Sequence, residues 1–111
     1  MNRTLFALAT AACLTPCVAD AWADDREFFE AKIRPLLVER CHECHSGAKK
    51  EEAGLRLDLR SGWQQGGDSG PAIVPGAPEK SLLIERVKSD DAELVMPPKM
   101  SGKPLTPLQI A

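Results

Sequence analysis

The sequence has no tyrosine, few other aromatic residues and no excess of basic charge. Its 111 residues include 14 Lys and Arg against 16 Asp and Glu, which gives a formal net charge of −2. No basic surface for nucleic acid is therefore indicated. Beyond the N-terminus, no apolar run approaches the ~20 residues that a membrane-spanning helix needs. The length allows at most one domain, so we expect a small, soluble, slightly acidic domain.

The N-terminus resembles a secretory signal peptide. Arg3 supplies a positive charge, residues 5–14 form a short apolar stretch, and Ala21-Trp22-Ala23 places small residues where a signal peptidase cleaves. We therefore predict a signal peptide over residues 1–23 and a mature domain over residues 24–111, exported to a periplasmic or equivalent extracytoplasmic space. The alternatives are a buried N-terminal helix and a lipoprotein anchored through Cys13, which is disfavoured because Thr10 lacks the large aliphatic side chain of a lipobox.

Few side chains are available to fill the core of the mature domain. Cleavage would remove Cys13 and Cys17 and leave Cys41 and Cys44. A small exported domain is usually stapled by several disulfides, and two cysteines do not supply them. The aromatic residues after the predicted cleavage site are Phe28, Phe29 and Trp63. This composition predicts that a group other than side chains occupies the centre of the domain.

Hydrophobic periodicity predicts two helices. The first covers residues 24–40, with one apolar stripe made of Phe28, Phe29, Ile33, Leu36 and Leu37. Pro35 must kink or split this helix near Arg34, because it lacks a donor and clashes one turn back. The second covers residues 78–88, with Pro78 near its first turn and a buried stripe of Leu83, Ile84 and Val87.

The sequence between and after these helices predicts an extended segment, a loop and the beginning of one further helix. Leucines that alternate over residues 55–59 predict a short extended piece, and residues 62–76 predict a loop with a helical turn around Trp63. Thr106-Pro107-Leu108-Gln109 has the pattern of an N-cap and capping box. The chain ends two residues later, so we expect a C-terminal helix that is cut short; a natural frayed tail is the alternative.

The segment Cys41-His42-Glu43-Cys44-His45 has the C-x-x-C-H spacing of a haem c attachment site. Two thiols three residues apart at a helix end can reach the two vinyl groups of one haem, and His45 lies one turn after Cys41, where its imidazole can bind the iron. A thiol–disulfide redox site would need a preceding strand, and a zinc site would need further Cys or His ligands, which the mature chain lacks. Chance occurrence is the remaining alternative.

The candidates for the second axial ligand of the iron are Met96 and Met100. His42 is held beside the proximal ligand and cannot reach the opposite face of the ring. The two prolines after Met96 stiffen its loop and aim the thioether, whereas Met100 precedes a looser Ser-Gly pair. We therefore favour Met96, and note that either methionine can simply fill a gap in the core.

Several motifs together resemble the planctomycete-type cytochrome c domain. They are Phe28-Phe29-Glu30, Ile33-Arg34-Pro35-Leu36-Leu37, the C-x-x-C-H segment, Gly54-Leu55-Arg56-Leu57-Asp58, residues 66–76, Ser81-Leu82-Leu83-Ile84 and Met96-Pro97-Pro98-Lys99. The resemblance implies an all-α, class I-like cytochrome c fold, with short helices and Gly/Pro-rich loops around one covalently bound haem c. It also implies that Cys41 and Cys44 carry the thioethers, that His45 is the proximal iron ligand and that Met96 is the distal ligand. The family continues with a C-terminal helix that packs on the first helix, where this chain stops.

Two further residues are candidates for contacts with haem. In c-type cytochromes a proline carbonyl after a glycine often accepts the N–H of the proximal imidazole, and Pro71 follows Gly70. An ordinary turn proline explains Pro71 equally well. Trp63 is a candidate to bind a haem propionate or pack on the ring edge, with plain core packing as the alternative.

The resulting expectation for function is single-electron transfer by a module that is not itself an enzyme. Its partner would be a redox protein or a fused downstream domain, because the resemblance implies that this module usually opens a larger exported protein. The alternatives are a haem-based gas sensor, which needs a displaceable distal ligand, and a thiol–disulfide redox protein.

Overall fold

The structure, a computed structural model, describes residues 19–111 and the side chains from residue 22 onward. The predicted signal peptide lies largely outside the described residues, and its predicted cleavage site falls within the first described helix. The all-α prediction is confirmed: residues 19–111 form helices and turns, with isolated bridges between His45 and Glu51 and between Gly67 and Gly70 in place of strands. Of the helices in that range, none is both long and apolar enough to cross a membrane.

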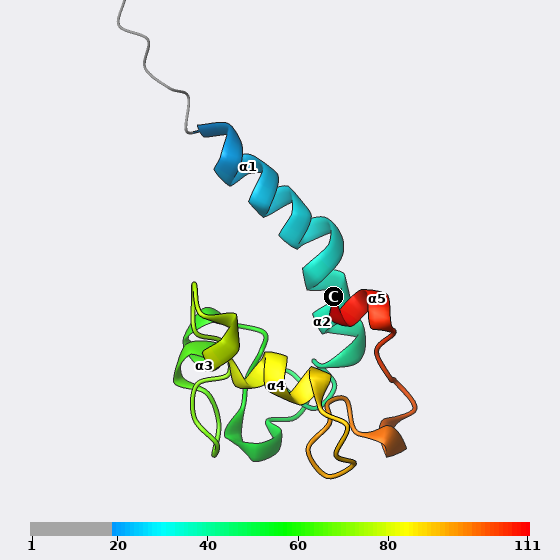
Figure 1. Cartoon of the computed structure of the whole chain (residues 1–111). Helices are drawn as coiled ribbons and strands as arrows, with labels where there is room; N and C mark the ends of the chain where they lie inside the picture. The colour runs from blue at the N-terminus through cyan, green and yellow to red at the C-terminus, as the bar shows by residue number, and fades with distance from the viewer. Residues whose placement is uncertain (1–18) are drawn as a thin grey trace, which may run out of the picture.

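Five α-helices alternate with π- and 3₁₀-helical turns along the described chain (Figure 1). In order they are α1 Ala19–Phe28, the π-turn η1 Phe29–Ile33, α2 Arg34–Arg40, η2 Glu52–Gly54, α3 Arg60–Gln65, η3 Pro78–Lys80, α4 Leu82–Lys88, η4 Lys99–Ser101 and α5 Pro107–Ile110. In Figure 1, α1 extends away from the loops that follow α2.

The predicted first helix forms and begins earlier than expected, at Ala19. Pro35 splits it, as predicted: the chain passes through η1 and restarts as α2 with Pro35 in its first turn. The N–H of Arg34 donates to the carbonyl of Phe29, five residues back, which is the π-helical register. The π-turn therefore lies in the turn before Pro35. The proline has no N–H, so it interrupts the hydrogen-bond pattern of a continuous α-helix.

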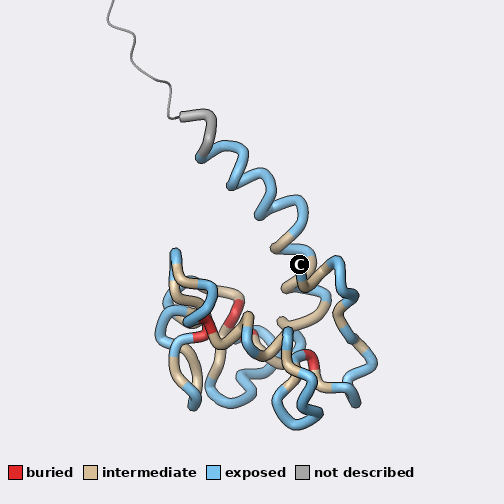
Figure 2. The backbone as a smooth tube through the Cα atoms, viewed as in Figure 1, coloured by how far each residue is buried: buried red, intermediate tan, exposed pale blue. Residues whose placement is uncertain are grey.

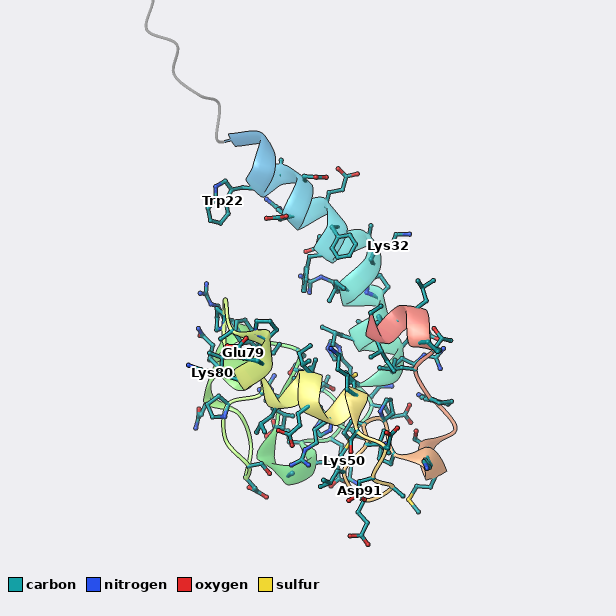
Figure 3. The ribbon with its side chains drawn as sticks, in the orientation of Figure 1. Trp22, Lys32, Lys50, Glu79, Lys80 and Asp91 are labelled. Atoms are coloured by element: carbon teal, nitrogen blue, oxygen red, sulfur yellow. The ribbon has the colours of Figure 1, made fainter. Side chains whose placement is uncertain are left out.

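The apolar stripe on this helix is exposed at its N-terminal half. Phe28 is 59% exposed and Phe29 is 37% exposed, whereas Leu36 and Leu37 are half-buried. The prediction assumed one α-helical period from residue 28 to residue 37. The π-turn inserts an extra residue, so that side chains before it are rotated about the axis relative to those after it. Trp22 also points away from the rest of the chain and is 78% exposed (Figure 3).

The predicted single helix over residues 78–88 is wrong, because Ser81 divides it into η3 and α4. Ser81 has an extended backbone conformation, with φ −89° and ψ 114°. Its buried hydroxyl donates to the carbonyl of Ala77 at 3.1 Å and accepts the N–H of Val74 at 2.9 Å. A serine side chain that bonds nearby backbone groups offers the chain an alternative to continuing the helix.

The predictions for the central segments are confirmed. Residues around Leu55 and Leu59 are extended, and Leu57 between them is buried. The expected helical turn around Trp63 is α3, which ends at Gln65 and is followed by Gly66 with a positive φ of 76°. The carbonyl of Trp63 accepts the N–H groups of Ala72 and Ile73, which ties the following loop back onto α3.

Buried side chains are few within the described part of the chain, and Figure 2 shows them at scattered positions. The buried apolar residues are Leu57, Ala72 and Pro97, and the buried polar residues are Ser46 and Ser81. The half-buried stripe Leu83, Ile84 and Val87 of α4 adds to this small core. So few buried apolar side chains agree with the expectation that side chains alone do not fill the domain.

The C-terminal capping box forms as the sequence predicts. Gln109 donates its backbone N–H to the hydroxyl of Thr106 at 3.3 Å, and its side-chain carbonyl accepts the N–H of Thr106 at 2.9 Å. Both exchanges fix the first turn of α5, with Pro107 at the first helical position.

Candidate haem attachment site

The Cys-x-x-Cys-His segment forms one tight turn directly after α2. The N–H of Cys41 and the N–H of His42 both donate to the carbonyl of Leu37, so the end of the helix leads straight into the turn. The carbonyl of Cys41 then accepts the N–H groups of Cys44 at 3.2 Å and His45 at 3.0 Å. One carbonyl thus gathers both cysteines and the histidine onto a single turn, as the spacing predicts.

His45 is half-buried, and its ring lacks a hydrogen-bond partner among the described residues. Its Nδ1 atom is buried without a partner, as is Nε2 of His42. A buried ring nitrogen normally finds a partner, because leaving one unpaired costs free energy. The backbone around His45 is well held: its carbonyl accepts the N–H of Leu57 at 2.8 Å, and the neighbouring Ser46 donates its hydroxyl to the carbonyl of His42 at 2.6 Å.

Cys41 and Cys44 are both free thiols and both half-buried. Burial raises the pKa of the Cys41 thiol, and the neighbouring Cys44 raises it further. A raised pKa keeps this thiol protonated at neutral pH, which is the opposite of what a nucleophilic redox cysteine needs. Over residues 19–111, no three His, Cys, Asp or Glu side chains gather closely enough to hold a metal ion among themselves.

The structure separates the two candidate methionines by their surroundings. Met96 is 36% exposed and lines an apolar groove of about 480 Å³, together with Val87, Val95, Pro97, Leu105 and Ile110. Its backbone N–H donates to the carbonyl of Arg86 at 3.1 Å, which ties the Met96 loop to α4. Met100 lies in η4 and is 95% exposed. The lining of the groove contains Met96 and does not include Cys41, Cys44 or His45.

The two weaker candidates, Pro71 and Trp63, have different surroundings. Pro71 is exposed, and no hydrogen bond joins its carbonyl to the buried Nδ1 of His45 in the described structure. Trp63 is half-buried on α3, and the guanidinium of Arg60 lies 6.0 Å from its ring centre. Its backbone carbonyl organises the loop that contains Pro71, so the two residues belong to one substructure.

Sequence reasoning missed two ion pairs that hold the attachment turn. The Nζ of Lys103 lies 2.6 Å from an oxygen of Glu43, which joins the C-terminal segment to the middle of the turn and lowers the pKa of the Glu43 carboxyl. Arg56 pairs with Asp58 beside the chain that follows His45. The first pair spans 60 positions and leaves no signal in the sequence. The Arg56–Asp58 pair does leave a signal in the sequence, because side chains two residues apart on an extended segment point to the same side.

These observations fit a covalently attached haem. Two free thiols stand three residues apart on one turn, and a histidine with an unpaired buried nitrogen follows them. The described chain buries only three apolar residues, so its own side chains do not form a full core. A planar apolar group held by this turn would supply the missing buried surface.

An all-helical chain with one such Cys-x-x-Cys-His turn belongs to the class of c-type cytochromes. Comparison with known families matches residues 41–100, more than half of the chain, to the family described as planctomycete cytochrome C. The chain belongs to this family, and it accordingly binds haem c covalently and transfers electrons. No curated protein and no solved structure matches the chain.

Proposed function

We propose that Cys41 and Cys44 carry the thioether bonds to one haem c, and that His45 and Met96 are its axial ligands. The observation that carries this proposal is the single turn on which one carbonyl gathers both thiols and the histidine. His45 contributes a ring nitrogen, and the two-proline loop after Met96 holds the thioether on an element separate from the turn. Trp63 and the carbonyl of Pro71 are proposed as additional contacts to the haem and to the His45 N–H.

When bound, the haem supplies an iron that alternates between Fe(III) and Fe(II). The task of the chain is to hold both axial ligands through this change and to exclude other ligands from the iron. A thioether from Met96 opposite an imidazole favours the reduced state relative to two imidazoles. We therefore propose an exported single-electron carrier that serves as the redox module of a larger chain and exchanges electrons with a partner protein or a fused domain, and not an enzyme in its own right.

Two alternatives predict different behaviour. A gas sensor would release its distal ligand in favour of carbon monoxide, and the position of Met96 in the apolar groove supports retention instead. A thiol–disulfide protein would need at least one low-pKa thiol, and burial raises the pKa of Cys41. Both observations favour electron transfer.

Covalent attachment is tested with a double variant, Cys41→Ala with Cys44→Ala, matched against Cys13→Ala with Cys17→Ala. Both variants remove two thiols, and only the first removes the proposed attachment points. After acid-acetone extraction, a pyridine haemochrome assay should detect haem in the parent and in the Cys13/Cys17 variant, and none in the Cys41/Cys44 variant. Haem that stays bound to the Cys41/Cys44 variant, or that is extracted from the parent, would show that the proposed thioethers do not exist.

Export is tested separately by deleting residues 1–23. Thioether formation in bacteria requires maturation outside the cytoplasm, so the shortened chain should accumulate without haem. Replacing residues 1–23 by an unrelated cleavable signal peptide is the control and should restore attachment. Covalent haem in the shortened chain would refute the requirement for export, and it would not affect the proposal that Cys41 and Cys44 carry the haem.

A further inference from the structure

The backbone of His45 is clamped between two neighbouring segments. On one side His45 forms a bridge with Glu51, and Glu52 donates its N–H to the carbonyl of Cys44 at 2.8 Å. On the other side Leu57 donates its N–H to the carbonyl of His45 at 2.8 Å. Because the backbone sets where the Cβ of a histidine lies and which rotamers its side chain can adopt, these two segments restrict where the His45 ring can lie.

The second segment is locked by a two-point ion pair. Arg56 donates to Asp58 through Nε at 3.1 Å and through Nη2 at 2.8 Å. The same carboxylate accepts the backbone N–H of Gly47 at 3.3 Å, two residues after His45. Since Arg56 and Asp58 lie on one side of an extended piece, Leu57 points to the other side, where it is buried. One carboxylate thus links the segment before α3 to the chain that leaves His45.

Two glycines show how closely this arrangement is packed. A Cβ at Gly47 would lie 2.3 Å from Cζ of Arg56, and a Cβ at Gly62 would lie 2.6 Å from the carbonyl oxygen of Arg56. A guanidinium fixed by two bonds to Asp58 cannot move aside without breaking them. Nε of Arg56 also lies 3.6 Å from a carboxylate oxygen of Glu51, the bridge partner of His45. The guanidinium therefore contacts both segments that flank His45.

We infer that the Arg56–Asp58 pair is a positioning device for His45, which sets the orientation of the imidazole plane through the Gly47 N–H and the Leu57–His45 backbone bond. The inference rests on the proposed role of His45 as an iron ligand and adds residues that do not touch the iron. Asp58 and Arg56 are thereby assigned a role in tuning the haem site, beyond that of an ordinary surface ion pair.

The test uses the full chain with haem attached and three substitutions. Asp58→Asn removes the charge that holds Arg56, whereas Gly47→Ala displaces the guanidinium without changing any charge. Glu30→Gln is the matched control, because it breaks a second two-point arginine–carboxylate pair, Arg34 with Glu30 at 2.6 and 2.9 Å, which is exposed and joins η1 to the start of α2. The readout is the proton NMR spectrum of the ferric protein, in which the shifts of the haem methyl groups depend on the orientation of the axial imidazole.

The expected result is that Asp58→Asn and Gly47→Ala both displace the haem methyl resonances, while the spectrum of Glu30→Gln superimposes on that of the parent. Unchanged methyl shifts and an unchanged reduction potential in the first two variants would overturn the inference, even if their denaturation midpoints fall. If Asp58→Asn retains no haem, Arg56→Lys replaces it. This variant keeps the charge and loses the two-point geometry, so it should move the same resonances, and a parental spectrum would again overturn the inference.

A separate variant, His45→Ala, distinguishes failure of the inference from failure of the proposed function. If His45 binds the iron, His45→Ala loses the parental low-spin spectrum whatever Asp58→Asn does. A parental spectrum in His45→Ala would show that His45 is not the iron ligand, and the proposed function would fail. A parental spectrum in Asp58→Asn together with a changed one in His45→Ala would remove only the positioning role.

Discussion

The hydroxyl of Ser81 stabilises the fold more than a single hydroxyl usually does, and we predict that Ser81→Ala lowers the free energy of unfolding. The side chain is 5% exposed, accepts the N–H of Val74 at 2.9 Å and donates to the carbonyl of Ala77 at 3.1 Å. Alanine removes both bonds and leaves the Val74 donor without a partner, which costs about 1–3 kcal/mol. With a urea m value of about 1 kcal/mol/M for a small domain, the unfolding midpoint should fall by about 1–3 M.

The assay is urea unfolding of the haem-loaded chain, followed by helical circular dichroism. Ser101→Ala is the matched control, since that hydroxyl accepts one N–H, from Lys103 at 3.3 Å, on an exposed turn. Its midpoint should move by less than about 0.5 M, because exposed substitutions typically change stability by less than about 0.5 kcal/mol. Equal midpoints for Ser81→Ala and the parent, at equal slope, would show that the break before α4 does not depend on the Ser81 hydroxyl.

Three further predictions concern other parts of the chain. Met96→Ala should open the reduced iron to carbon monoxide and Met100→Ala should not, as measured by difference spectra; the reverse pattern would make Met100 the ligand. Gly66→Ala should cost about 1–3 kcal/mol from its backbone conformation alone, and more because the new Cβ would lie 1.7 Å from the carbonyl oxygen of Gly70; an unchanged urea midpoint would contradict this. The ion pair with Arg56 lowers the pKa of Asp58 from 3.8 to about 2. Its contribution to stability should therefore be complete above about pH 4 and disappear as the pH falls toward 2, and Asp58→Asn should remove that part of the pH dependence of the urea midpoint.

The features that the sequence predicted correctly are local ones. The Cys-x-x-Cys-His turn, the capping box of Thr106 and Gln109, the helical turn around Trp63 and the break ahead of Pro35 each depend on residues a few positions apart. In these cases the chemistry of a side chain determines the local backbone conformation. The Thr106 hydroxyl caps the first turn of a helix, and Pro35 lacks the N–H that a continuous helix needs. The family resemblance is likewise confirmed, over residues 41–100.

The features that sequence reasoning missed depend on the position of distant segments. Nothing near Ser81 indicates that its hydroxyl would find Val74, seven residues back, and so end one helical turn before the next begins. The pair of Lys103 with Glu43 joins segments 60 positions apart. Phe28 is exposed because α1 extends away from the loops that follow α2, and residues 22–32 are exposed on all sides of the helix (Figure 1). The axial role of Met96 stays a prediction.

The π-turn at Phe29–Ile33 also sets the direction in which α1 presents its side chains. Each residue of an α-helix advances the side-chain direction by about 100°. Deleting one residue from this turn would restore the α-helical register and rotate Trp22, with everything else on α1, by about that angle relative to α2. A single extra residue thus acts as an angular spacer, because it decides which side of α1 faces the same way as the Cys-x-x-Cys-His turn and which side faces away from it.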